Sequence, residues 1–312
     1  MKRANRWLLY GPLLVAALIL AGWRVAWGNG ADAMRRALAD FSATEAARGV
    51  SVSFSPLRAR GFPFYLRGAV DAFSVSAGDD AYDCARLYLD ALPYQPDRVI
   101  FSCGGDQRAA LGGEVWTITA PDARASLEND RDRGWIVRAE TGAFAAAAGG
   151  RELVIESLMI NIAPDKEESG AIDVSFRAVE AAPPAAAKID IARIDAALRI
   201  FPTDAFNRRR VDVLGLEAVV NDGVLSASGS LGIDSAGVTG QLDAGVEKPV
   251  GIVRAIAAAG LLDENDAQAA QAGLAMLAVA SGGRIAAPIE FQGNEVRLAG
   301  VSLGRIGDPA QP

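Results

Sequence analysis

The sequence contains no histidine, two cysteines and only four lysines among its 31 basic residues. The absence of histidine removes the commonest general base, the usual metal ligand and every Ser-His or Cys-His nucleophile pair. Two cysteines cannot complete a structural zinc site without histidine. No lysine lies three residues after a serine, so the Ser-x-x-Lys arrangement is absent as well. We therefore expect a protein that is not an enzyme, with no catalytic residues, no cofactor and no metal site.

Basic charge is also scarce relative to acidic charge. The chain has 31 basic and 38 acidic residues, a net charge of -7 and a pI of about 4.9. Nucleic-acid binding depends on an excess of Lys and Arg facing the phosphates, so we expect no nucleic-acid partner. The 312 residues, 51% of them hydrophobic, are enough for one large domain or two small ones.

One long apolar run stands near the N-terminus, at Leu8–Trp27, and three basic residues precede it. About 20 apolar residues span a bilayer as a helix, and basic residues stay on the cytoplasmic side. The run ends in Gly22–Trp27, which is a poor cleavage site for the alternative, a removable signal peptide. We predict a transmembrane anchor over residues 1–28, with the N-terminus cytoplasmic and the body on the far side.

After the anchor, Gly28-Asn29-Gly30 predicts a flexible break, and residues 29–49 predict an amphipathic stem helix. Met34, Leu38 and Phe41 recur at helical spacing along it. One interpretation is a stem that lies on the membrane or packs on a sheet. The other is a plain helix that covers the first strand.

From residue 50 to 247 the apolar residues alternate with polar ones, which is typical of half-buried strands. Asp222-Gly223 between two alternating runs is the clearest hairpin signal. A change in the alternation near Glu156 predicts a bulge or bend there. We predict a mainly β (α+β) fold whose body is an extended or curved antiparallel sheet with one apolar face.

The spacing of the apolar residues changes again over residues 248–306. Helical spacing follows Pro249 and recurs over Ala267–Ala280, which predicts a helical pair packed on the sheet. A closing β-hairpin is expected across Gly293-Asn294, and residues 307–312 are expected to form a disordered tail.

Cys84 and Cys103 are expected to lie on adjacent strands in an oxidising compartment, which favours a disulfide worth about 3 kcal/mol. Pairing Leu89 with Val99 would place Cys103 opposite Ala85, so a one-residue shift or a bulge is needed.

Two charged clusters, Glu128–Asp132 and Arg208–Arg210, are interpreted as a solvated turn and a solvated strand edge rather than as ligand sites.

Two phenylalanines, Phe62 and Phe64, flank Pro63 after the first strand. They are interpreted either as a wedge that faces lipid or a partner, or as core plugs at a strand crossing. Leu216 and Leu225, on the strands of the Asp222-Gly223 hairpin, are predicted to point toward the apolar face.

Three segments of the sequence resemble those of a known family. They are Gly61–Phe64 after an amphipathic stem, Arg86–Pro96, and Ala257–Asp263 followed by Ala275–Gly282 and the closing hairpin. Their order along the chain resembles the proteobacterial family DUF2125, and the resemblance runs from the anchor to about Gly304. It implies an inner-membrane-anchored periplasmic protein and transfers no catalytic residue. A looser analogy links it to β-rich envelope proteins of the AsmA kind.

The leading functional hypothesis is a non-enzymatic, single-pass protein of the bacterial inner membrane that binds lipid or an envelope partner through an apolar sheet face. The alternative is a structural or scaffolding protein with an ordinary closed β core. A hydrolase that depends on carboxylates alone is a third class, and no paired motif supports it.

Overall fold

The computed structural model describes residues 6–92, 95–182, 191–204, 208–234, 237–258, 268, 271–272, 274, 276, 281, 283–293, 295–298 and 301–305. The chain divides into two compact units, Met1–Thr117 and Ile118–Pro312, which we call the N-terminal unit and the C-terminal unit. Most of the described residues lie in antiparallel strands, as predicted.

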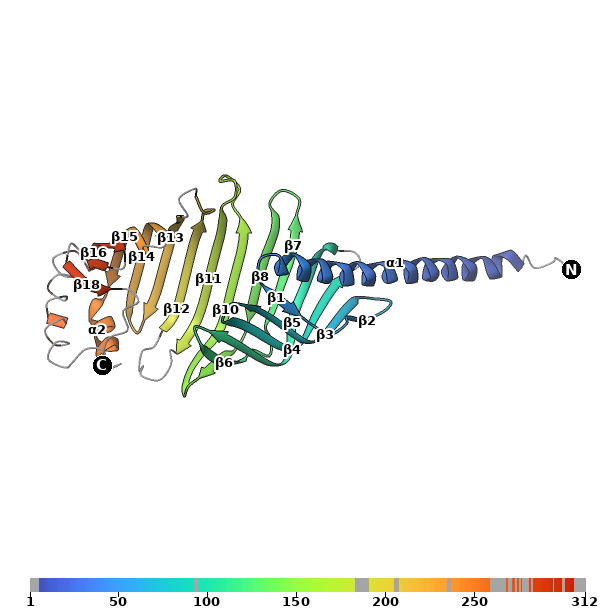
Figure 1. The fold of residues 1–312 in the computed structure, drawn as a ribbon, viewed down its shortest axis with the longest axis horizontal. Helices are drawn as coiled ribbons and strands as arrows, with labels where there is room; N and C mark the ends of the chain where they lie inside the picture. Colours follow the sequence, from blue (N-terminus) through green and yellow to red (C-terminus); the bar gives the residue numbers. More distant parts are fainter. Residues whose placement is uncertain are drawn as a thin grey trace. The chain divides into compact units, whose positions relative to one another are not determined.

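The N-terminal unit begins with one long helix, α1 (Arg6–Ala46), drawn in blue in Figure 1. The predicted flexible break at Gly28-Asn29-Gly30 is wrong, because the helix runs through it without interruption. Each glycine costs a helix only about 1 kcal/mol relative to alanine. A Cβ at Gly30 would lie 3.2 Å from Leu66 Cδ2, so the missing side chain lets the helix approach the sheet closely.

The strands of this unit form a sheet built around β3 (Leu66–Ala77). β1 (Ser51–Ser53) and β2 (Arg58–Arg60) pair with its two halves, and β4 (Asp80–Leu92) pairs along its length. β5 (Gln95–Leu111) then pairs with β4, and the boundary of the unit, after Thr117, falls within β6 (Glu114–Thr119). Sequence alternation did not predict β2, because three residues are too few to show a period.

The second half of α1 covers this sheet. Ala31, Met34 and Leu38 form one buried cluster with Leu66, Val70 and other strand residues. The helix passes so close that a Cβ at Gly68 would lie 2.5 Å from Met34 Sδ. The stem is therefore a helix that packs on the sheet, an arrangement that both interpretations include.

The C-terminal unit is a longer antiparallel sheet. Its strands are β7 (Arg124–Asp130), β8 (Gly134–Thr141), β9 (Phe144–Ala148), β10 (Arg151–Pro164), β11 (Ile172–Ala182), β12 (Ile191–Ile200), β13 (Arg209–Val220), β14 (Gly223–Asp234), β15 (Gly237–Glu247), β16 (Arg284–Gly293), β17 (Glu295–Leu298) and β18 (Val301–Arg305). From β10 to β18 each strand pairs with the next in chain order, and Figure 1 shows β10 to β16 side by side. β8 and β9 pair with successive stretches of β10, and β7 pairs with β8.

The predicted irregularity near Glu156 is present. The ladder between β10 and β11 leaves out Glu156 and Glu180, and Glu180 has a φ of 49°. Ile155 and Leu158, on the two sides of this point, consequently contact the same hydrophobic cluster. The bend therefore joins the two apolar halves of β10 on one face.

The predicted C-terminal helical pair is supported in its first member only. This is α2 (Pro249–Ala258), which packs against the turn between β13 and β14. A Cβ at Gly223 would lie 2.5 Å from Ile252 Cγ1, so glycine is needed where the helix meets the turn. Most of the second expected helix, Ala267–Ala280, and the tail at 307–312 lie outside the described residues.

Candidate functional site

The candidate site is one face of the C-terminal sheet, which we call the apolar face. Directly paired residues of antiparallel strands point to the same side, so the strand register shows which side chains share a face. From β10 to β16 the register aligns four uninterrupted apolar rows. These rows are Leu158, Ala178, Ile194, Ala218, Leu225, Val246 and Ile285; Ile160, Phe176, Ala196, Leu216, Ala227, Ala244 and Ala287; Ile162, Val174, Leu198, Val213, Gly229, Leu242 and Ile289; and Pro164, Ile172, Ile200, Val211, Leu231, Gly240 and Phe291.

A bulge in β13 keeps the rows aligned. The pairing of β13 with β14 shifts between Val213 and Leu216, and its pairing with β12 shifts at the same level. An extra residue in a strand turns the following side chains by half a period. Val213 and Leu216 therefore share one face although they are three residues apart.

The apolar face is only partly shielded by the described part of the chain. Of the four rows, Ala178, Val213 and Leu242 belong to the buried core. Leu216 is 37% exposed and Ile172 is 42% exposed, and most of the remaining side chains are half-buried. Leu216 and Leu225, the two leucines predicted for this face, occupy adjacent rows on it.

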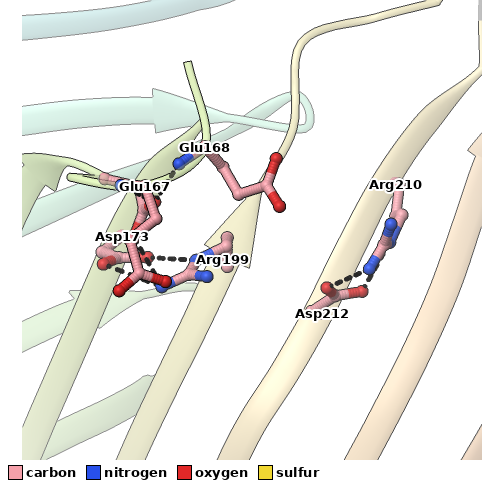
Figure 2. Close-up of polar contacts among 7 residues, drawn as sticks. Glu167, Glu168, Asp173, Arg199, Arg210 and Asp212 are labelled. Carbon is pink, nitrogen blue, oxygen red and sulfur yellow. Dashed lines mark hydrogen bonds and ion pairs between the residues drawn. The ribbon is translucent and has the colours of Figure 1, made fainter. Parts of the chain in front are cut away.

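The opposite face of the same strands is charged. Arg177, Asp195 and Glu217 align across β11 to β13, and Arg193 bridges the two acidic residues. Figure 2 shows two further pairs, Arg199 with Asp173 and Arg210 with Asp212. The sheet is therefore amphipathic, with charges compensated on one side and apolar rows on the other.

Arg199 also pairs with Asp165, in the turn between β10 and β11, whose side chain is 5% exposed. Its Oδ1 accepts hydrogen bonds from the backbone N–H groups of Glu168 at 2.6 Å and Glu167 at 2.8 Å. Arg199 lies 2.5 Å from its Oδ2. The N–H of Glu168 above all, and then Glu167 and Arg199, hold the pKa of the Asp165 carboxyl below its ordinary value. A carboxyl held ionised in this way is suited to a structural role rather than to general acid catalysis.

The two phenylalanines predicted as a wedge or as core plugs lie in the N-terminal unit, in the loop Gly61–Tyr65. Phe62 is 42% exposed and Phe64 is 80% exposed. The core-plug interpretation is therefore wrong for both residues. Buried plugs at this position would have needed a second layer over the loop, whereas the sheet core is filled by α1.

Cys84 and Cys103 form a disulfide with their Cα atoms 6.0 Å apart. Leu89 pairs with Phe101, two residues away from the predicted partner, so the predicted register is wrong. The bulge that the disulfide requires is nevertheless present, since the ladder shifts between Cys84 and Arg86. Gly105, with a φ of 86°, supplies the backbone conformation for it.

No group of three or more His, Cys, Asp or Glu side chains that could hold a metal ion is found among the described residues. The fold and the face together define an amphipathic, mainly antiparallel β protein with one apolar N-terminal helix. That helix is long and apolar enough to cross a membrane, and its apolar segment is unburied.

The chain belongs to the DUF2125 family, described as an uncharacterized protein conserved in bacteria, whose model matches residues 27–306. The family membership that the three sequence segments predicted is thereby confirmed. No curated protein and no solved structure matches the chain.

Proposed function

We propose that this protein is a non-enzymatic, membrane-anchored protein whose apolar face binds lipid acyl chains. The observation that carries the proposal is the set of four apolar rows that cross seven consecutive strands without a charged residue. Large exposed apolar patches on soluble proteins mark sites of interaction with proteins, membranes or apolar ligands. A charged opposite face would keep the sheet soluble while the apolar face is occupied.

The dimensions of the face suit an acyl chain. Adjacent strands lie about 4.8 Å apart, so the six spacings from β10 to β16 extend over roughly 29 Å. The hydrocarbon core of a bilayer is about 30 Å thick for two leaflets, so one chain needs about half of that length. Each methylene removed from water contributes about 0.8 kcal/mol, so a chain laid along one row would bind favourably.

One row favours a particular path for the chain. The row that contains Leu216 has alanine at β12, β14, β15 and β16. The rows on both sides carry larger residues, among them Leu198 and Leu225. Because an alanine side chain ends at Cβ, a strip of alanines leaves room for a methylene chain between the larger neighbours.

The N-terminal half of α1 would hold the body beside its lipid source. We propose a single-pass anchor in the bacterial inner membrane, with the N-terminus in the cytoplasm and both units in the periplasm. Three basic residues precede the apolar run, in agreement with a cytoplasmic N-terminus. The disulfide between Cys84 and Cys103 suits an oxidising compartment.

Lipid analysis of the full-length protein purified in mild detergent tests the proposal. Leu216→Asp places a charge in the alanine-rich row, and we expect it to lose most of the acyl lipid that accompanies the wild type. Met159→Asp is the matched control, because Met159 is 52% exposed and pairs with Arg177 on the charged face. This control should keep the lipid. Wild-type protein free of acyl lipid above the detergent background would contradict lipid binding.

The same pair of variants separates the proposal from a closed-core scaffold. In a closed core, the Asp at position 216 would be buried without a partner and the C-terminal unit would unfold. On an open face, Leu216→Asp should keep the circular dichroism spectrum of the wild type. A spectrum that collapses only in Leu216→Asp would favour the scaffold.

A further inference from the structure

Two tryptophans of α1 donate hydrogen bonds to the loop Gly61–Tyr65. The Trp23 indole Nε1 donates a hydrogen bond to the Pro63 carbonyl oxygen at 2.5 Å. The Trp27 indole Nε1 donates to the Tyr65 carbonyl oxygen at 3.0 Å. Both indole rings are half-buried, and Trp27 also meets the Phe62 ring edge to face at 6.1 Å. The loop therefore has a fixed place along the helix.

The loop is also closed on itself. The backbone N–H groups of Phe64 and Tyr65 both donate to the Gly61 carbonyl oxygen, at 3.1 Å and 3.2 Å. Gly61 has a φ of 102°, and a Cβ there would lie 2.6 Å from the Tyr65 carbonyl oxygen. Only glycine fits this position, so the turn that presents Phe64 is built into the sequence.

The level of the loop along α1 follows from the helix geometry. The apolar run Leu8–Trp27 has 20 residues and a length of about 30 Å, which matches the hydrocarbon thickness of a bilayer. Trp23 and Trp27 occupy its last two turns, whereas Ala31 and Met34 just beyond already belong to the protein core. The loop consequently lies where α1 leaves the hydrocarbon.

The side chains presented at this level have the chemistry of a membrane interface. Phe64 is 80% exposed, and Phe62 and Tyr65 are each 42% exposed. The guanidinium of Arg24 lies over the rings of Trp27 and Phe62, 5.5 Å and 5.8 Å from their centroids. Aromatic rings with an adjacent cation are what the boundary between acyl chains and phosphates favours.

We propose that the Gly61–Tyr65 loop is a second membrane contact, in which the Phe64 ring enters the bilayer that α1 crosses and Arg24 faces the lipid phosphates of that leaflet. The inference rests on the anchor role proposed above for α1. A helix alone leaves the N-terminal unit free to rotate about the helix axis. A second contact beside the helix would fix which side of the unit faces the membrane.

Depth-dependent quenching in phosphatidylcholine–phosphatidylglycerol vesicles tests this contact. Both native cysteines are in the disulfide, so Phe64→Cys provides a single thiol for an environment-sensitive fluorophore. Nitroxides near the lipid headgroup should quench most of its emission. Leu111→Cys is the matched control, because Leu111 is 56% exposed and lies at the end of β5 remote from the loop. Emission at position 111 should be unaffected.

A third label separates failure of the loop from failure of the anchor. Leu18→Cys, in the middle of the apolar run, should be quenched by nitroxides deep in the acyl chains. If the label at position 18 is quenched and the label at position 64 is unaffected, as at position 111, the anchor role of α1 is supported and the loop contact is refuted. If positions 18 and 64 both escape quenching, the anchor and the loop contact are refuted together.

Discussion

Both units have strands with one apolar face, but the two faces differ in how far they are buried. In the N-terminal unit α1 covers the face, and Val70 and Leu89 are 0% and 5% exposed. In the C-terminal unit the described residues leave Leu216 and Ile172 at 37% and 42% exposure. Alternating sequence therefore establishes that a strand has an apolar side, whereas the presence of a covering helix decides whether that side becomes a buried core or stays partly exposed.

The largest difference is expected when one leucine of each unit is truncated. Leu89→Ala should lower the free energy of unfolding by about 2–5 kcal/mol, because it opens a cavity in a closed core. Leu216→Ala should cost only about 1 kcal/mol, the typical value for a substitution that leaves no sealed cavity. Urea unfolding in detergent without added lipid, followed by circular dichroism, measures both values. Equal losses would mean that the two faces are equally closed.

The disulfide should stabilise the N-terminal unit alone. Replacing Cys84 and Cys103 together by serine removes a cross-link between residues 19 apart, and we expect a loss of about 3 kcal/mol. Limited proteolysis with mass spectrometry, which reports cleavage by sequence position, should show new cuts before Thr117 and an unchanged pattern after it. New cuts throughout the chain would show that the units do not unfold separately.

The close approach of α1 predicts a smaller effect at one glycine. Gly68→Ala forces a Cβ to within 2.5 Å of Met34 Sδ and 2.9 Å of Leu57 Cδ1, and we expect a loss of about 1–3 kcal/mol. Gly215→Ala in the β13 bulge is the control, because no atom lies within 4 Å of its added Cβ. Thermal unfolding should distinguish the two variants. Identical melting temperatures would contradict the tight seating of the helix.

The smallest predicted effect is a loss of stability at low pH. The pKa values of Asp165 and Asp212 in the C-terminal unit are lowered, chiefly by the Glu168 N–H and by Arg210 respectively. In the N-terminal unit Arg86 lowers the pKa of Asp71. Lowered carboxyl pKa values add stability above the ordinary value of 3.8, and this stability is lost as the pH falls below it. Each unit should therefore unfold more easily in urea at pH 3 than at pH 6, and Asp165→Asn, which removes the titrating carboxyl, should reduce this pH dependence in the C-terminal unit. A pH dependence that Asp165→Asn leaves unchanged would contradict the role given to Asp165.

Features that depend on local chemistry were predictable from the sequence. The predicted hairpin forms, with Asn221 and Asp222 as the turn residues between the paired Val220 and Gly223. Leu216 and Leu225 share a face because strand alternation has a period of two. The membrane-spanning length of the first apolar run also follows from composition alone.

Features that depend on tertiary contacts were not predictable. The register of the two strands that carry Cys84 and Cys103 differs from the expected one because the ladder shifts between Ala91 and Leu92, where the alternation of β4 gives no sign of a shift. The helix continues through Gly28 and Gly30 because packing on Leu66 outweighs the low helix propensity of glycine. The continuity of the four rows likewise depends on the β13 bulge, which alternation alone does not reveal.

Photo-crosslinking in native membranes tests the central claim most directly. A photoreactive amino acid at position 216 should form adducts with lipid acyl chains, and the same residue at position 159, on the charged face, should form none. Acyl adducts at both positions, or at neither, would contradict the proposal that the apolar face of the C-terminal unit binds lipid.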